Sequence, residues 1–338
     1  MGLVSMGISI FGDVKSVWAR LALSLTIVLG VTSAYENAQA QHYPSQDIHL
    51  VSAFPPGSGA DVLVRFFAER LRMVTGRTVL VENKAGASGN IATEYVVRSK
   101  PDGYTILVHS ANTLASNYHL IRNNPVDAGK QIQVAATINR QAFMLVVYPK
   151  RPWKSAGELA EYAKVKGDKG TYAVSGNGSI IMCSIYKEQA GLATVDVSYK
   201  SANDTLNDIA SGNVDFSCHD PAFALSQQRE GRLRILAIAS GQRMASTPDI
   251  PTMTELGYPM DLVGWFAAMV PSTTPRPIID QINAWFAKIH ADPETPKFLN
   301  NFGGVPWMST PEEGQARLLK DIKDFADYIR IAKLKPQG

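Results

Sequence analysis

Three glycine-rich segments carry the residues of this chain with the clearest capacity for chemistry. They are residues 54–61 (FPPGSGAD), 85–90 (AGASGN) and 175–179 (SGNGS). Each follows a short apolar run and precedes a helical pattern, so each predicts a helix start with free backbone N–H groups. Such groups, aided by the helix dipole, bind a carboxylate or phosphate without a cationic side chain. The three segments therefore predict a site for an anion.

Motifs of enzymes do not accompany these segments. A nucleophile elbow requires Gly-x-Ser-x-Gly, and the segment that begins at Gly86 has Asn90 in the last position. A dinucleotide loop requires a third glycine where Val62 stands, and no P-loop lysine follows any of the three segments. The six histidines show no metal-ligand spacing. We therefore predict a protein that is not an enzyme, holds its anion unchanged and uses neither a metal nor a cofactor.

Alternating strand and helix patterns place the three segments. The expected strands are residues 48–54, 78–82, 104–109, 142–148, 171–174, 195–199, 214–218, 234–239 and 265–270. The expected helices are residues 60–74, 90–99, 155 through 162, 180–190 and 202–211, with a mostly helical stretch from 277 to about 333. This alternation predicts an α/β fold with parallel sheets. A length of 338 residues exceeds what one core usually supports, so we predict two lobes. Ligands bind beyond the carboxyl ends of such strands, so facing lobes would bring the segments to one cleft.

The first 40 residues predict export. Lys15 and Arg20 precede the apolar run at residues 21–31, and the small-residue motif at 38–40 (AQA) follows. This order is typical of a signal peptide, with a short membrane anchor as the alternative.

Charge and cysteine content limit the partners. The formal net charge of +3 is spread along the sequence without a basic run, which argues against a nucleic-acid partner. Cys183 and Cys218 are too few for a disulfide scaffold. They form either one bridge in an oxidising compartment or two separate thiols.

Seven short segments, taken in their order and spacing, carry a family resemblance. They are residues 54–61 with Arg65, 81–89 (VENKAGASG), 100–104 (KPDGY), 175–179, Tyr199-Lys200, Val214-Asp215 leading to Asp220, and 248–252 (PDIPT). In them the chain resembles the tripartite tricarboxylate transporter receptors, the Bug-type periplasmic solute-binding proteins. The resemblance implies a two-lobe type II periplasmic binding fold with two crossovers. It also implies a monomeric receptor that closes on a small carboxylate solute for a membrane permease.

The resemblance implies lobe bounds and ligand contacts as well. After a signal peptide at 1–40, lobe I comprises 41–140 plus 265–338 and lobe II comprises 141–264. The contacts, chiefly through backbone amides, hydroxyls and waters, are Phe54, Gly57, Ser58, Ala60, Asp61, Ala87, Ser88, Ser110, Asn112, Ser175, Asn177 and Ser179, with Asp220 on the opposite wall. Many relatives carry a histidine where this chain has Ile181-Met182-Cys183, so contacts of that histidine are not transferred.

Several of these residues have a second interpretation. Asp61 either stabilises a helix start or shapes the ligand loop, and Ser88 and Ser179 are either hydroxyl donors or ordinary turn residues. Asp220 either binds a ligand amine or hydroxyl or caps the segment that begins at Pro221. A buried aspartate repels a carboxylate, which favours a ligand with a polar or amine-bearing far end. For the whole chain, a periplasmic sensor partner and a hydrolase are the alternative functions.

Overall fold

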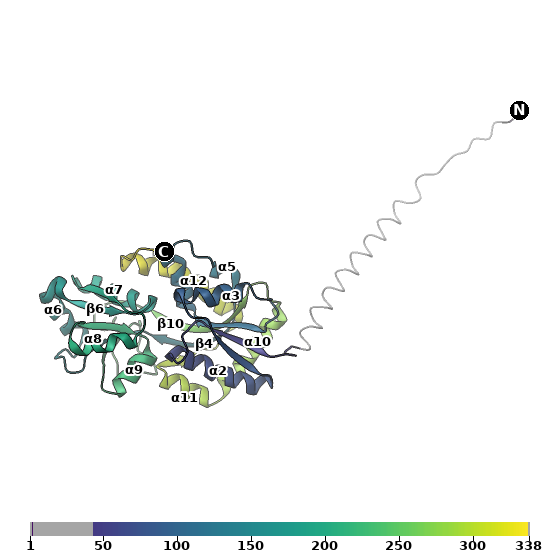
Figure 1. Ribbon diagram of the computed structural model, residues 1–338, viewed down its shortest axis with the longest axis horizontal. Coiled ribbons are helices and arrows are strands. Elements are labelled where there is room, and N and C mark those ends of the chain that lie inside the picture. Colours follow the sequence, from purple (N-terminus) through teal and green to yellow (C-terminus); the bar gives the residue numbers. More distant parts are fainter. Residues whose placement is uncertain (1, 3–42, 337–338) are drawn as a thin grey trace. The chain divides into compact units, whose positions relative to one another are not determined.

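The computed structural model describes residue 2 and residues 43–336 and contains two compact units, Met1–Ser45 and Gln46–Gly338. Apart from residue 2, the predicted signal peptide lies outside the described residues. In the described part, no helix combines the length and the apolar character needed to cross a membrane. The second unit holds all the strands and helices considered below (Figure 1).

A mixed six-stranded sheet forms the first lobe of this unit, in the order β11-β4-β10-β3-β1-β2. Its strands are β1 (Ile48–Ser52), β2 (Val79–Asn83), β3 (Thr105–Ser110), β4 (Ile132–Ala142), β10 (Val263–Pro271) and β11 (Gly304–Pro306). Its helices are α2 (Gly59–Thr75), α3 (Asn90–Val97), α4 (Ala111–Leu120), α5 (Ala128–Gln131), α10 (Arg276–Ala291), α11 (Glu294–Asn301) and α12 (Pro311–Ile331). A short 3-10 turn, η1 (Ala87–Gly89), precedes α3.

A five-stranded sheet forms the second lobe, in the order β7-β6-β8-β5-β9. Its strands are β5 (Met144–Val147), β6 (Thr171–Val174), β7 (Val195–Ser198), β8 (Phe216–His219) and β9 (Arg234–Ile238). Its helices are α6 (Ala156–Lys166), α7 (Asn177–Ala190), α8 (Leu206–Ser211) and α9 (Pro221–Arg229), with the 3-10 turns η2 (Gly167–Lys169) and η3 (Asn203–Thr205). Figure 1 shows these helices gathered at one end of the unit and those of the first lobe at the other. The two-lobe α/β fold is confirmed.

The chain passes between the sheets twice. It runs from β4 into β5 through the single residue Phe143, and it returns from β9 to β10 through residues 239–262. The ring of Phe143 lies against the start of α7, where a Cβ on Gly178 would stand 2.2 Å from it. The lobe bounds at 140 and 264 stay a prediction, and β4 continues in the first sheet to Ala142.

The expectation of purely parallel sheets is wrong. β1 is parallel to β2 and β3, and β6 is parallel to β7 and β8. However, β10 is antiparallel to β3 and β4, and β5 is antiparallel to β8 and β9. A crossover helix between two strands makes them parallel, whereas β5 and β10 enter from the other sheet without one. The helix α4 and the strands β4 and β11 were also absent from the expected elements.

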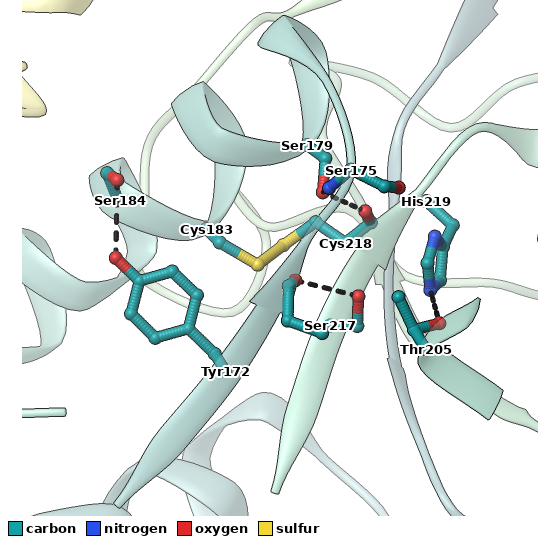
Figure 2. The surroundings of a disulfide bond; sticks show 10 residues. Tyr172, Ser175, Ser179, Cys183, Ser184, Thr205, Ser217, Cys218 and His219 are labelled. Carbon is teal, nitrogen blue, oxygen red and sulfur yellow. Dashed lines mark hydrogen bonds between the residues drawn. A yellow bond between two sulfur atoms is a disulfide. The ribbon is translucent and has the colours of Figure 1, made fainter. Parts of the chain in front are cut away.

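A disulfide fixes α7 to the second sheet. Cys183 on α7 and Cys218 on β8 are both fully buried, and their Cα atoms are 5.8 Å apart (Figure 2). The sequence left open one disulfide or two separate thiols, and the structure contains the disulfide. Tyr186 of α7 belongs to a core cluster that also includes Phe325 and Ile329 of α12, so apolar packing continues from one lobe to the other.

Candidate functional site

A cavity of about 880 Å³ lies at the carboxyl ends of strands from both sheets. Residues that follow β1, β3, β6 and β8 line it. All three glycine-rich segments contribute to the lining, as the position of ligand sites in open α/β sheets leads one to expect. The structure therefore brings together the segments that the sequence singled out.

Ten of the thirteen predicted contact residues reach this cavity. They are Phe54, Gly57, Ser58, Ala60, Ser88, Ser110, Asn112, Ser175, Asn177 and Asp220. The cavity lining does not include Asp61, Ala87 or Ser179.

Four helices begin at the cavity wall. Oxygens of Ser58, Ser110 and Asp220 accept a backbone N–H in the first turn of α2, α4 and α9, respectively. The fourth, α7, starts after Gly176 and has no side-chain cap. Each helix start carries partial positive charge and N–H groups, so their convergence favours a negative ligand.

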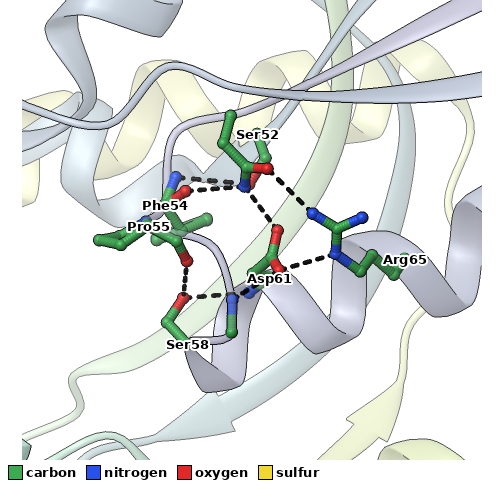
Figure 3. Close-up of polar contacts among 8 residues, drawn as sticks. Ser52, Phe54, Pro55, Ser58, Asp61 and Arg65 are labelled. Carbon is green, nitrogen blue, oxygen red and sulfur yellow. Dashed lines mark hydrogen bonds and ion pairs between the residues drawn. The ribbon is translucent and has the colours of Figure 1, made fainter.

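Asp61 does not line the cavity, and its carboxylate is bound by neighbouring residues of the first lobe (Figure 3). Its side chain is 1% exposed and accepts hydrogen bonds from the Gly57 amide at 2.9 Å, Arg65 Nε at 2.8 Å and Asn83 Nδ2 at 2.6 Å. Burial raises the pKa of Asp61, but these hydrogen bonds together outweigh it and hold the pKa below its ordinary value. Both carboxylate oxygens are occupied within the first lobe, which supports the role of Asp61 in shaping the loop, and a ligand contact of Asp61 stays a prediction.

Ser179 and Ala87 also lie outside the cavity lining, and their role as ligand contacts stays a prediction. The Ser179 hydroxyl donates to the Cys218 carbonyl at 2.5 Å and accepts from the Ser175 amide at 3.2 Å, and the residue is 1% exposed (Figure 2). Its single proton is used inside the second lobe. Ala87 lies on the exposed side of η1 with φ 46°.

An asparagine network connects the second and third segments across the lobes. Asn177 Nδ2 donates to Ser116 Oγ at 3.0 Å and to Asn117 Oδ1 at 2.8 Å. Asn117 Nδ2 donates in turn to the Ser88 carbonyl and to Asn90 Oδ1, each at 2.9 Å. The start of α7 is thereby held against α4 of the first lobe.

The comparisons with known proteins agree with this geometry. A model of the tripartite tricarboxylate transporter family receptor matches residues 63–332. The chain belongs to this family. The resemblance identified from the sequence is thereby confirmed.

Relatives and solved structures support the same assignment. This family member is 29% identical over 322 residues to protein BugT of Bordetella pertussis, an alignment that covers 94% of this chain and 99% of BugT. It superposes on a structure of an R. palustris protein with adipate at a TM-score of 0.81, with 26% identity, covering 87% of this chain and 100% of the other. It also superposes on the structure of the periplasmic binding protein BugD at a TM-score of 0.78, with 28% identity, covering 87% of this chain and 100% of BugD.

Two buried histidines in this family member line the cavity and were missed from the sequence. Burial lowers the pKa of His109 to about 4, with a smaller opposing effect of the Ser88 backbone, and burial lowers the pKa of His219 to about 3. His109 is packed so closely that a Cβ on Gly89 would lie 2.2 Å from its Nε2. Both histidines lie at the carboxyl ends of strands, β3 and β8. This position could have identified them in the sequence, because ligands bind beyond the strand ends in this fold.

The charged residues of the described lining are Lys200, Arg229 and Asp220. Lys200 and Arg229 are exposed, so they stand at the rim of the cavity. Asp220 caps α9 through a hydrogen bond from the Phe223 amide to Oδ1 at 3.0 Å. Burial raises the pKa of Asp220, and backbone hydrogen bonds oppose this effect. The capping interpretation of Asp220 is therefore correct, and its role toward a ligand stays a prediction.

Proposed function

We propose that this family member captures a small carboxylate-bearing solute in the cavity, in the periplasm, and delivers it to a membrane permease. The observation that carries the proposal is the convergence of four helix starts from two lobes on one cavity. The R. palustris relative, 26% identical and solved with adipate, supports a carboxylate as the ligand.

The proposed binding mode uses main-chain amides first. The carboxylate docks on the amides of residues 54–61 and 86–90, and the ten lining residues named above form the contact set. The 175–179 segment then closes over the solute by a hinge motion near Phe143 and Gly264. The hydrogen bonds of Asn177 with α4 join the lobes and would hold them together after closure. A monomer suffices, because both walls of the cavity come from one chain.

Binding without a chemical reaction separates this proposal from a hydrolase. A thermal-shift screen over mono-, di- and tricarboxylates should raise the melting temperature for a subset of acids, because a ligand of the native state stabilises it. Recovered ligand should be chemically unchanged. A panel in which no acid shifts the melting temperature, or in which an acid is consumed, contradicts the proposal.

A cavity-filling variant gives the matched test of the site. Ala60→Trp places a large side chain in the cavity lining and should abolish the thermal shift. Val165→Trp adds the same side chain on α6 at a position 91% exposed and outside the lining, and should leave the shift intact. Equal shifts in both variants would mean that the acid binds elsewhere.

Delivery to a permease is tested by uptake. Cells that lack this chain should lose uptake of the identified acid and regain it when the chain is restored. Normal uptake in its absence would favour the alternative role as a periplasmic sensor partner.

A further inference from the structure

The side chain of His219 is oriented differently from that of its neighbour Cys218. Cys218 points from β8 toward α7, where it forms the disulfide, whereas His219 contacts η3 and α9. Its ring is 1% exposed, lies edge-on to Phe223 at a centroid distance of 4.8 Å and belongs to the cavity lining. Figure 2 shows one ring nitrogen joined to Thr205 and the other on the opposite side of the ring.

The hydrogen bonds of Thr205 determine where the His219 proton lies. Thr205 Oγ1 donates its single proton to the Ala202 carbonyl at 2.7 Å. The 3.2 Å contact between Thr205 Oγ1 and His219 Nε2 therefore requires Nε2–H as the donor. Burial lowers the pKa of His219 to about 3, so the ring is neutral and carries no second proton. Nδ1 is consequently an acceptor.

This acceptor has no hydrogen-bond partner among the described residues. Leaving a buried acceptor unpaired is costly, and the site recovers that cost when a ligand donates to it. Gln227 Oε1, which belongs to the same cavity lining, is a second buried acceptor without a partner in the described part of the chain. Asp220 adds a carboxylate next to His219. His219, Gln227 and Asp220 therefore form an acceptor-rich part of the second-lobe wall, whereas the helix starts of both lobes supply donors.

We propose that His219 Nδ1 accepts a hydrogen bond from the solute and thereby selects acids that also carry a hydroxyl or ammonium group. This inference rests on the proposed function, because it assumes that the carboxylate occupies the helix starts. A site built to pair with a substrate donor discriminates strongly against the analogue that lacks it. A second carboxylate at this wall would instead meet His219 Nδ1 and Asp220 without a proton to share.

Matched acids that differ only in the donor test the proposal. Succinate, malate and aspartate form one set, and butyrate with 3-hydroxybutyrate forms another, with affinities measured by isothermal titration calorimetry at pH 7.5. The donor-bearing acid should bind about tenfold or more tightly than its partner, which corresponds to about 1.4 kcal/mol. Malate and aspartate separate a hydroxyl from an ammonium donor.

Variants at two positions connect that preference to the ring nitrogen. His219→Phe keeps an aromatic ring and removes the acceptor, so it should abolish the preference. His219→Asn keeps an acceptor in a position similar to Nδ1 and should retain it. Thr205→Val removes the partner that keeps the proton on Nε2, so it should reduce the preference while the ring stays in place.

The outcomes distinguish this inference from the proposed function. If no acid binds the wild-type protein, the proposed function itself is wrong. If acids bind but members of each set bind equally, or if the donor-free acid binds more tightly, only the selection by His219 is overturned. A preference that survives in both His219→Phe and Thr205→Val also overturns it. If His219→Phe does not fold, the wild-type sets together with Thr205→Val decide the question.

Discussion

Acidification from pH 7.5 to 5.0 is expected to destabilise the fold through His109 and His219. Burial lowers the pKa of these residues to about 4 and about 3, whereas an unfolded histidine titrates near 6.5. Between those values the unfolded chain binds a proton that the native chain does not, so stability is complete above pH 6.5 and decreases as the pH falls.

The size of the effect follows from the pKa difference. Each of the two histidines stays neutral in the native state down to pH 5.0. It therefore lowers the free energy of unfolding by about 1.4 kcal/mol for each pH unit below 6.5, or by about 2 kcal/mol at pH 5.0. The two together therefore remove about 4 kcal/mol, a large part of the 5–15 kcal/mol that is typical of a folded protein. Burial raises the pKa of Asp220 and Asp321, and protonation of these groups in the native state opposes the loss.

Urea unfolding at several pH values between 7.5 and 5.0 measures the effect, and a variant separates the histidines from the carboxylates. His109→Gln keeps both aspartates, so its free energy of unfolding should fall by about 2 kcal/mol less than that of the wild type over this range. In the wild type, the NMR signals of the two buried rings should show no titration down to pH 5. Equal pH slopes for wild type and variant, or a buried ring that titrates near 6.5, would refute the reasoning.

Three further perturbations have definite expected outcomes. Replacing Cys183 and Cys218 by alanine should lower the free energy of unfolding by about 3–4 kcal/mol, because the bridge closes a loop with a sequence separation of 35, and an unchanged urea midpoint would contradict this. Asn177→Ala removes three hydrogen bonds between the lobes and should weaken acid binding about tenfold by calorimetry, with little change in the urea midpoint of the ligand-free protein. Gly178→Ala places a methyl group 2.2 Å from the Phe143 ring and should cost about 1–3 kcal/mol in unfolding, a loss that Phe143→Leu in the same chain should reduce.

The sequence predicted the segments with local signals and missed those whose polar residues are satisfied by distant parts of the chain. The glycine-rich helix starts were recognisable because turn chemistry is local. Strand β4 was missed because its buried Thr137, Asn139 and Gln141 interrupt the apolar pattern. Thr137 donates to the Trp307 carbonyl and Asn139 accepts from the Phe266 amide, and these partners are known only once the chain is folded.

In the candidate site, too, residues with local sequence signals were predicted, whereas contacts with distant parts of the chain were not. Ten of the predicted contacts lie in the cavity lining, because loops at the strand ends of an α/β sheet border the ligand cleft. The hydroxyl of Ser179, predicted to contact the ligand, donates instead to the Cys218 carbonyl, 39 positions away in the sequence. His219 was not among the predicted contacts, and its hydrogen bond with Thr205, which lies on a different element, is known only once the chain is folded.

Phe143 alone connects β4 to β5, so the amino acids at positions 143 and 178 together affect how far the two lobes can rotate. If the lobes rotate there, the aromatic ring moves together with the joint and remains next to the bare backbone of Gly178. Any side chain at 178 would overlap the ring in the arrangement described here, so the joint would have to settle at a different angle. Engineering a sensor with a wider or narrower opening would therefore require changing positions 143 and 178 as a pair.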